Sequence, residues 1–182
     1  NMSEKIIKVL LVDDQPLILN ILKRGLSGVE GIEVVGTATD GYIALHTIRN
    51  VQPDVIVLDL EMPRMNGLQF LHNLMPVKPI PTIVLSALTA SDSKLTEEAF
   101  EAGAVDFQKK PSGGAQALLT MIGQLGTKIK IAATKDVKQL KRVQKDYKLP
   151  SNHLDRTTKS NKIVLGMGAI DVSNDPEKEI KI

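Results

Sequence analysis

The sequence predicts an α/β domain built on a parallel sheet, with helices on both of its faces, over roughly the first 125 residues. Short runs rich in β-branched residues alternate there with longer segments whose apolar residues recur at helical spacing. Glycine and proline stand at the joins between the two kinds of segment. This alternation is typical of successive β–α–β units.

Five segments are predicted to be strands: residues 8–12, 33–38, 55–60, 82–85 and 104–108. The first, third and fourth are almost continuously apolar. Such runs indicate strands that are buried on both faces, as parallel strands are when helices cover both sides of the sheet.

Five helices are predicted to follow these strands in turn, at residues 16–26, 42–50, 68–75, 92–102 and 115–125. Pro53 and Pro81 precede strands, and Gly103 follows a helix. Because functional groups of an open parallel sheet gather at the carboxyl ends of its strands, that edge is where we look for a site.

Composition excludes several classes of protein. No apolar run approaches the ~18 residues of a membrane span, and no signal sequence is evident, so we expect a cytoplasmic protein without membrane contact. The absence of cysteine excludes disulfides, a thiolate nucleophile and a thiolate zinc site. His46, His72 and His153 show no metal-ligand spacing.

Charge is unevenly distributed along the chain. Residues 1–125 hold 10 basic and 14 acidic side chains, and residues 126–182 hold 13 and 7. A basic amphipathic helix is predicted over residues 134–148, ended by Pro150. We interpret it as an interdomain linker first, a docking or dimerising helix second and a nucleic-acid contact last. Residues 151–161 are predicted to be a loop, and residues 162–165 a strand.

Five polar side chains stand at the carboxyl ends of predicted strands. They are Asp13 and Asp14 after the first, Asp59 at the third, Ser86 at the fourth and Lys110 at the fifth. Neighbouring carboxylates raise one another's pKa unless a cation neutralises them, and Mg²⁺ prefers such hard oxygen ligands. A metal ion there would keep Asp59 an anionic nucleophile, while Lys110 would neutralise an incoming phosphoryl group. Taken singly, each acid could instead cap a helix or end a strand.

Four motifs at these strand ends resemble the receiver domains of two-component response regulators, over roughly residues 6–125. They are LLVDDQP, VLDLEMPRMNG, VLSAL and VDFQKKP. The resemblance implies a flavodoxin-like (βα)5 doubly wound sheet with strand order 2-1-3-4-5. It also implies a phosphorelay phosphoprotein that catalyses its own phosphoryl transfer and dephosphorylation.

The resemblance further assigns roles to individual residues. It implies that a sensor histidine kinase or a small phosphodonor phosphorylates Asp59, and that Lys110 and Ser86 bind the phosphoryl group. Asp14, Asp59 and the backbone carbonyl of Glu61 would bind Mg²⁺, with Asp13 acting through a water molecule.

Phe107 stands three residues before Lys110, where receiver domains place an aromatic switch residue. A plain role as a core aromatic is an equal alternative. Ser86 replaces the commoner threonine and lacks the methyl group that restricts its rotamers. Of the two adjacent lysines we assign Lys110 to the site because Pro111 follows it, and we expect Lys109 to face solvent.

Within the receiver domains, EVVGTATDGYIAL, LDLEMPRMNGLQFL and AGAVDFQKKPSGG are most similar to the receiver of the chemotaxis protein-glutamate methylesterase. Where that family carries a nucleophilic serine this chain has GMGAI, so we expect no esterase site in it. The resulting division is a receiver over residues 6–125, a basic helical linker and loop over 126–161, and a strand-like tail over 162–182.

Three readings of the function stay open. We expect a phosphoacceptor receiver that switches an output domain or protein, with nucleic-acid binding not expected. One alternative is the regulatory half of a truncated methylesterase, of which the tail would be the stub of the output domain. The other is an interaction module that keeps the acidic pocket but never accepts phosphate.

Overall fold

The structure, a computed structural model, describes residues 5–87 and 90–135. The predicted loop and tail, and nearly all of the predicted basic helix, lie outside these residues. The division of the chain into three parts therefore remains a prediction.

Five parallel strands form one sheet in the order β2-β1-β3-β4-β5. Their bounds are Ile7–Val12 for β1, Ile32–Ala38 for β2, Val55–Asp59 for β3, Thr82–Ser86 for β4 and Asp106–Lys109 for β5. The predicted α/β class and strand order are confirmed. The three inner strands β1, β3 and β4 are the three that the sequence marks as continuously apolar.

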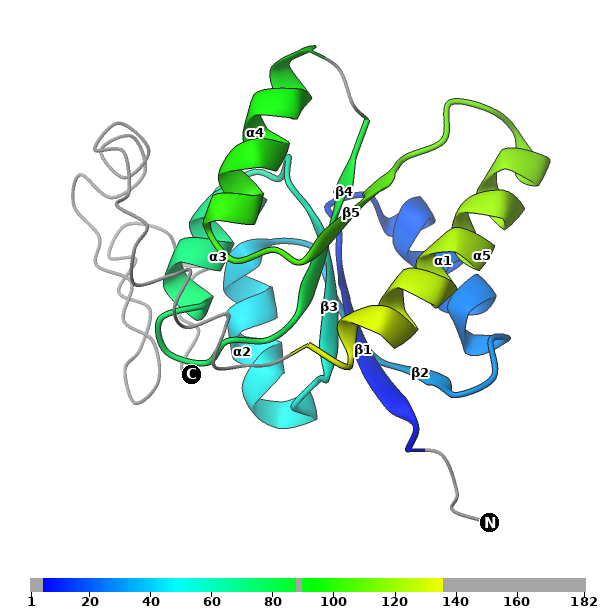
Figure 1. Cartoon of the computed structure of the whole chain (residues 1–182), viewed down its shortest axis with the longest axis horizontal. Helices are drawn as coiled ribbons and strands as arrows, with labels where there is room; N and C mark the ends of the chain where they lie inside the picture. Colours follow the sequence, from blue (N-terminus) through cyan, green and yellow to red (C-terminus); the bar gives the residue numbers. More distant parts are fainter. Residues whose placement is uncertain (1–4, 88–89, 136–182) are drawn as a thin grey trace.

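Helices cover both faces of the sheet (Figure 1). Helices α1 (Pro16–Ser27) and α5 (Ala115–Ala132) pack on one face. Helices α2 (Gly41–Val51), α3 (Gly67–Leu74) and α4 (Ala90–Glu101) pack on the other. Among the helices described, none is both long and apolar enough to span a membrane.

Alternate side chains of each inner strand enter different hydrophobic cores. In β1, Leu10 and Val12 pack toward α2 and α3, whereas Val9 and Leu11 pack toward α1 and α5. The sheet is therefore clamped between two cores, and the carboxyl ends of its strands are held in a fixed relation to one another.

All predicted boundaries except the end of α5 lie within two residues of the observed ones, and contacts in the structure explain two of the differences. Helix α5 ends at Ala132 rather than at residue 125, because Gly126 lies inside the helix and packs near Val29 instead of ending it. Strand β5 begins at Asp106 rather than at residue 104, because the amide of Ala104 still donates to the carbonyl of Ala99 in α4, 2.9 Å away.

Candidate functional site

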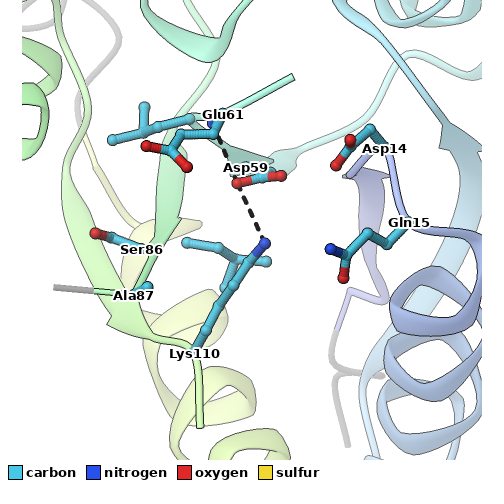
Figure 2. A pocket seen from close by; sticks show the side chains of 9 residues that line it. Asp14, Gln15, Asp59, Glu61, Ser86, Ala87 and Lys110 are labelled. Carbon is cyan, nitrogen blue, oxygen red and sulfur yellow. Dashed lines mark hydrogen bonds and ion pairs between the residues drawn. The ribbon is translucent and has the colours of Figure 1, made fainter. Parts of the chain in front are cut away.

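A pocket of about 210 Å³ opens where β1, β3, β4 and β5 end (Figure 2). The register of the sheet explains why. Asp59 at the end of β3 pairs with Leu85 of β4, and Ser86 pairs with Lys109, so Lys110 follows directly beside the acids. The residues that line the pocket are Asp14, Gln15, Asp59, Leu60, Glu61, Leu85, Ser86, Ala87 and Lys110.

Asp13 lies beneath the pocket rather than in its lining and is fully buried. One of its carboxylate oxygens, Oδ1, accepts a 2.9 Å hydrogen bond from the amide of Gln15. The other, Oδ2, forms a 3.0 Å ion pair with the Nζ of Lys110. Asp13 thus forms an ion pair with Lys110 beneath the pocket, whereas the half-buried Asp14 lines the pocket.

Asp59 is a buried carboxylate, and its polar contacts within the described part of the chain fall on one oxygen. Its Oδ1 lies 3.2 Å from the Nζ of Lys110 and accepts a hydrogen bond, also 3.2 Å, from the amide of Glu61 (Figure 2). Burial of Asp59, together with the neighbouring Asp13 carboxylate, raises the pKa of Asp59 to about 7. Lys110 and the Glu61 amide act in the opposite direction but do not cancel this effect.

Lys110 bridges the two buried acids. Burial of its ammonium group acts to lower the pKa of Lys110, but the adjacent Asp59 and Asp13 carboxylates raise it above its usual value. Lys110 is therefore a permanent cation at physiological pH. Lys109 is exposed, as predicted, so the strand alternation places only one of the two lysines in the site.

The loop from Leu60 to Asn66 contributes Leu60 and Glu61 to the lining of the pocket. Its closing residue is Gly67, whose amide donates to the carbonyl of Leu60 at 2.9 Å. A Cβ atom at Gly67 would lie 2.6 Å from the carbonyl oxygen of Asp59, so no other residue fits there without displacing the acceptor strand. Asn66 and Gln69 then form a capping box that starts α3.

Ser86 ends β4 on the side of the pocket opposite Asp14 (Figure 2). Its carbonyl accepts a 2.8 Å hydrogen bond from the amide of Lys110, which ties the ends of β4 and β5 together. Figure 2 shows its hydroxyl group pointing away from the Asp59 carboxylate. Because serine rotates freely about χ1, a single rotamer change redirects this hydroxyl.

The acids of the pocket fit a hard divalent cation. Asp13, Asp14 and Asp59 each offer a carboxylate oxygen within 4.8 Å of the others. The ammonium group of Lys110 pairs with Asp13 and Asp59, and the pKa of Asp59 stays raised, first by its burial and then by the neighbouring Asp13 carboxylate. An oxygen-only set of this kind suits Mg²⁺ better than a transition metal.

Phe107 does not line the pocket but lies on β5, three residues before Lys110. Its ring meets that of Phe100 of α4 edge-on, with centroids 6.4 Å apart. The Nζ of Lys128 in α5 lies 5.4 Å from the ring centroid and donates a 2.7 Å hydrogen bond to the Phe107 carbonyl. Phe107 thus touches both helices that flank β5, and its role as a switch remains a prediction.

Three features of the site escape sequence reasoning. Gln15 lines the pocket, and only its place beside the acidic pair could have indicated this. Lys128 reaches Phe107 from a turn of α5 that lies beyond the predicted helix end. Arg64 forms an ion pair with Asp40, a residue 24 positions away that no motif connects to it.

Comparison with known proteins is consistent with this geometry. Residues 9–123 match the family described as response regulator receiver domain. The protein-glutamate methylesterase/protein-glutamine glutaminase of Syntrophotalea carbinolica is 46% identical over 138 residues, which are 75% of this chain and 39% of that protein. A second such protein, from Syntrophus aciditrophicus, is 48% identical over 127 residues, which are 70% and 37%.

Solved structures show the same likeness. The response regulator domain of Thermotoga maritima CheB superposes with a TM-score of 0.67 at 36% identity, covering 72% of this chain and 99% of that one. The receiver domain of the response regulator NarL from Mycobacterium tuberculosis gives a TM-score of 0.56 at 29% identity, covering 69% and 98%. The chain thus spans less than two fifths of the methylesterases it resembles but nearly all of these isolated receiver domains.

Proposed function

This chain belongs to the response regulator receiver domain family, and we propose that its Asp59 accepts a phosphoryl group from a sensor histidine kinase. The resemblance to the receiver of protein-glutamate methylesterases is confirmed. The observation that carries the proposal is the placement of Lys110, which lines the acidic pocket and pairs with both Asp59 and the buried Asp13.

The free oxygen of Asp59 supplies the nucleophile. Within the described residues both contacts of the carboxylate fall on Oδ1, so Oδ2 is the atom available to attack phosphorus. The new bond joins Oδ2 to phosphorus, and the bond from phosphorus to the donor nitrogen breaks, with its electron pair returning to the kinase histidine. Lys110 then neutralises charge on the transferred group.

The acidic residues would hold Mg²⁺ beside this carboxylate. We assign Asp14, Asp59 and the backbone carbonyl of Glu61 as direct ligands and Asp13 as a ligand through water. When bound, the ion offsets the charge of the phosphoryl oxygens and lowers the pKa of Asp59. The 4.8 Å grouping of the three carboxylates supports this assignment.

Ser86 and Phe107 would convert phosphorylation of Asp59 into a conformational change at the surface of the domain. A phosphoryl group on Asp59 gives the Ser86 hydroxyl an acceptor inside the pocket, toward which one rotamer change turns it. The position of Phe107 against α4 and α5 makes its ring the element that would pass this movement to a surface. Receiver domains of this family regulate output domains, and we propose a methylesterase-type output domain as the target here.

Intact-mass measurement after incubation with acetyl phosphate and Mg²⁺ tests the proposal. We expect the mass to rise by one phosphoryl group in the wild-type chain, and to stay unchanged without metal and in Asp59→Asn. An unchanged wild-type mass would favour the remaining alternative, a module that binds partners without phosphorylation.

A further inference from the structure

We propose that an ion pair outside the pocket, between Arg64 and Asp40, positions the loop that carries Glu61 and thereby sets the affinity of the pocket for a divalent cation. Arg64 lies in the loop between β3 and α3, and Asp40 precedes α2. The inference rests on the proposed metal site, and it concerns two residues that neither line the pocket nor belong to the acidic cluster.

Asp40 is a buried carboxylate, 1% exposed, with both oxygens in use. Oδ1 accepts a 2.9 Å hydrogen bond from the amide of Ile43 and so caps the N-terminus of α2. Oδ2 pairs with the guanidinium group of Arg64. A buried charge with a single cationic partner holds that partner firmly, because separation would leave it unpaired away from water.

Arg64 has an unusual backbone for its residue type. Its φ is 66°, in the left-handed region that residues with a side chain rarely adopt. Such a conformation persists only where its surroundings impose it. The Asp40 carboxylate is a contact from outside the loop that acts on Arg64 at this position.

The next pair of residues makes a second contact between the same two segments. Met65 is buried, and a Cβ atom at Gly41 would lie 2.5 Å from its sulfur. Consecutive loop residues, Arg64 and Met65, therefore meet consecutive residues at the start of α2, Asp40 and Gly41. We call these four residues the clasp.

A short segment of the loop, closed by a hydrogen bond at its base, connects the clasp to the pocket. Glu61 lines the pocket three residues before Arg64, and its amide donates to the Asp59 carboxylate. Because the amide of Gly67 also donates to the carbonyl of Leu60, the loop is closed at its base and has little slack. Movement at Arg64 must therefore displace Glu61, and Mg²⁺ tolerates little displacement of its ligands.

The direction in which the affinity for the metal ion changes distinguishes a positioning role of Arg64 from a purely electrostatic one. Arg64 is a cation near a cation-binding pocket, so removing it would strengthen metal binding if only electrostatics mattered. If the clasp positions the loop, removing Arg64 weakens binding instead. Outer partners of metal ligands typically account for about 10- to 100-fold in affinity.

The test is calorimetric titration of the full chain with Mn²⁺, a stand-in for Mg²⁺ that gives a strong signal with oxygen ligands. The variants are Arg64→Ala, Arg64→Gly, which eases the left-handed backbone, and Asp40→Asn, which keeps the oxygen that caps α2. Arg49→Ala is the matched control, because Arg49 is an exposed arginine in the last turn of α2. Circular dichroism establishes that each variant is folded.

We expect Arg64→Ala, Arg64→Gly and Asp40→Asn each to raise the dissociation constant for Mn²⁺ by about tenfold, whereas Arg49→Ala leaves it unchanged or slightly lowers it. Should the folded Arg64 variants bind as tightly as the control, the clasp would be a structural contact only and the inference would be overturned. A wild-type chain that binds no Mn²⁺ would overturn the proposed metal site and this inference together. Should Arg64→Ala fail to fold, Arg64→Gly decides the outcome, because Asp40→Asn removes a negative charge and so weakens metal binding on electrostatic grounds as well.

Discussion

Asp59 and Asp13 are two buried carboxylates with one ammonium group between them, and the chemistry of the pocket follows from that imbalance. The pKa of Asp59 is raised to about 7 by its burial and by Asp13. Without a metal ion, this group is therefore only partly ionised at neutral pH. The same arrangement that disfavours the free Asp59 anion favours a bound cation that compensates its charge.

The raised pKa predicts how the stability of the metal-free protein depends on pH. The folded chain keeps a proton on Asp59 that the unfolded chain has lost above pH ~4. The free energy of unfolding should therefore fall as pH rises from about 4 to about 7, by on the order of 3 kcal/mol, and level off above that range. Urea unfolding in the presence of a chelator, at a series of pH values, measures this slope.

Asp59→Asn is the control for this measurement. The variant should lose most of the decline between pH 4 and pH 7 and should be more stable than the wild-type chain at pH 8. Equal slopes in the two proteins would mean that Asp59 titrates near its ordinary pKa, contrary to the burial described here.

Lys110 and Lys109 offer a matched pair of substitutions. Lys110→Met removes the ion-pair partner of two buried acids, so it should cost about 2–4 kcal/mol of unfolding free energy at pH 8. Lys109→Met alters an exposed side chain and should change stability by less than about 0.5 kcal/mol. Chemical denaturation of both variants gives the comparison, and similar losses would show that the strand alternation is misassigned.

The sequence predicts which side chains meet in the pocket but not how they are paired. Asp14, Asp59, Ser86 and Lys110 line it because parallel strands end at a common edge. Asp13 is buried and pairs with Lys110, whereas Asp14 lines the pocket. This difference depends on the directions of the two side chains, which cannot be predicted from two adjacent positions in the sequence. The ion pair between Arg64 and Asp40 depends on the approach of two loops and carries no periodic signal.

At the scale of elements, α5 is the helix whose extent differs most from its prediction. The spacing of buried residues continues through Ile129 and Ala132, past the glycine that suggests a boundary. Gly126 lies inside the helix, where a Cβ atom would meet Val29 at an ordinary contact distance of 3.5 Å. A single glycine in an otherwise periodic segment costs only about 1 kcal/mol relative to alanine and does not by itself end a helix.

A pair of isoleucines tests the longer helix. Ile129 is fully buried between α5 and the sheet, whereas Ile131 is 52% exposed. Ile129→Ala should cost about 2–5 kcal/mol of unfolding free energy through the cavity it leaves. Ile131→Ala should stay within about 0.5 kcal/mol. Equal effects in thermal or urea unfolding would place the last turns of α5 outside the folded unit.

For the molecule as a whole, two cores on opposite faces of the sheet hold the strand ends rigidly while the pocket itself stays acidic. The α/β class could be predicted from the apolar runs and their alternation with helices. The strand order 2-1-3-4-5 could not be obtained from those patterns alone, since local periodicity does not specify which strands pair. It was implied by the resemblance to receiver domains and is confirmed.

Binding of Mg²⁺ should stabilise the whole chain, because the proposed ligands come together only in the folded state. At 100 times its dissociation constant, Mg²⁺ should add about 2.7 kcal/mol to the free energy of unfolding. At a fixed Mg²⁺ concentration the gain should be larger at pH 8 than at pH 6, since Asp59 must lose its proton to bind the ion and the dissociation constant is therefore higher at pH 6. Thermal melts with Mg²⁺ at both pH values measure it, and a gain independent of pH would indicate binding elsewhere.

The central claim is that Asp59, and no other acid of the pocket, carries the phosphoryl group. Borohydride reduces an aspartyl phosphate to homoserine, so treating the phosphorylated chain with borohydride and sequencing its peptides by mass spectrometry locates the acceptor without any substitution. We expect homoserine at position 59 alone. Homoserine at Asp13 or Asp14, or at no position in a chain that has gained a phosphoryl group, would contradict it.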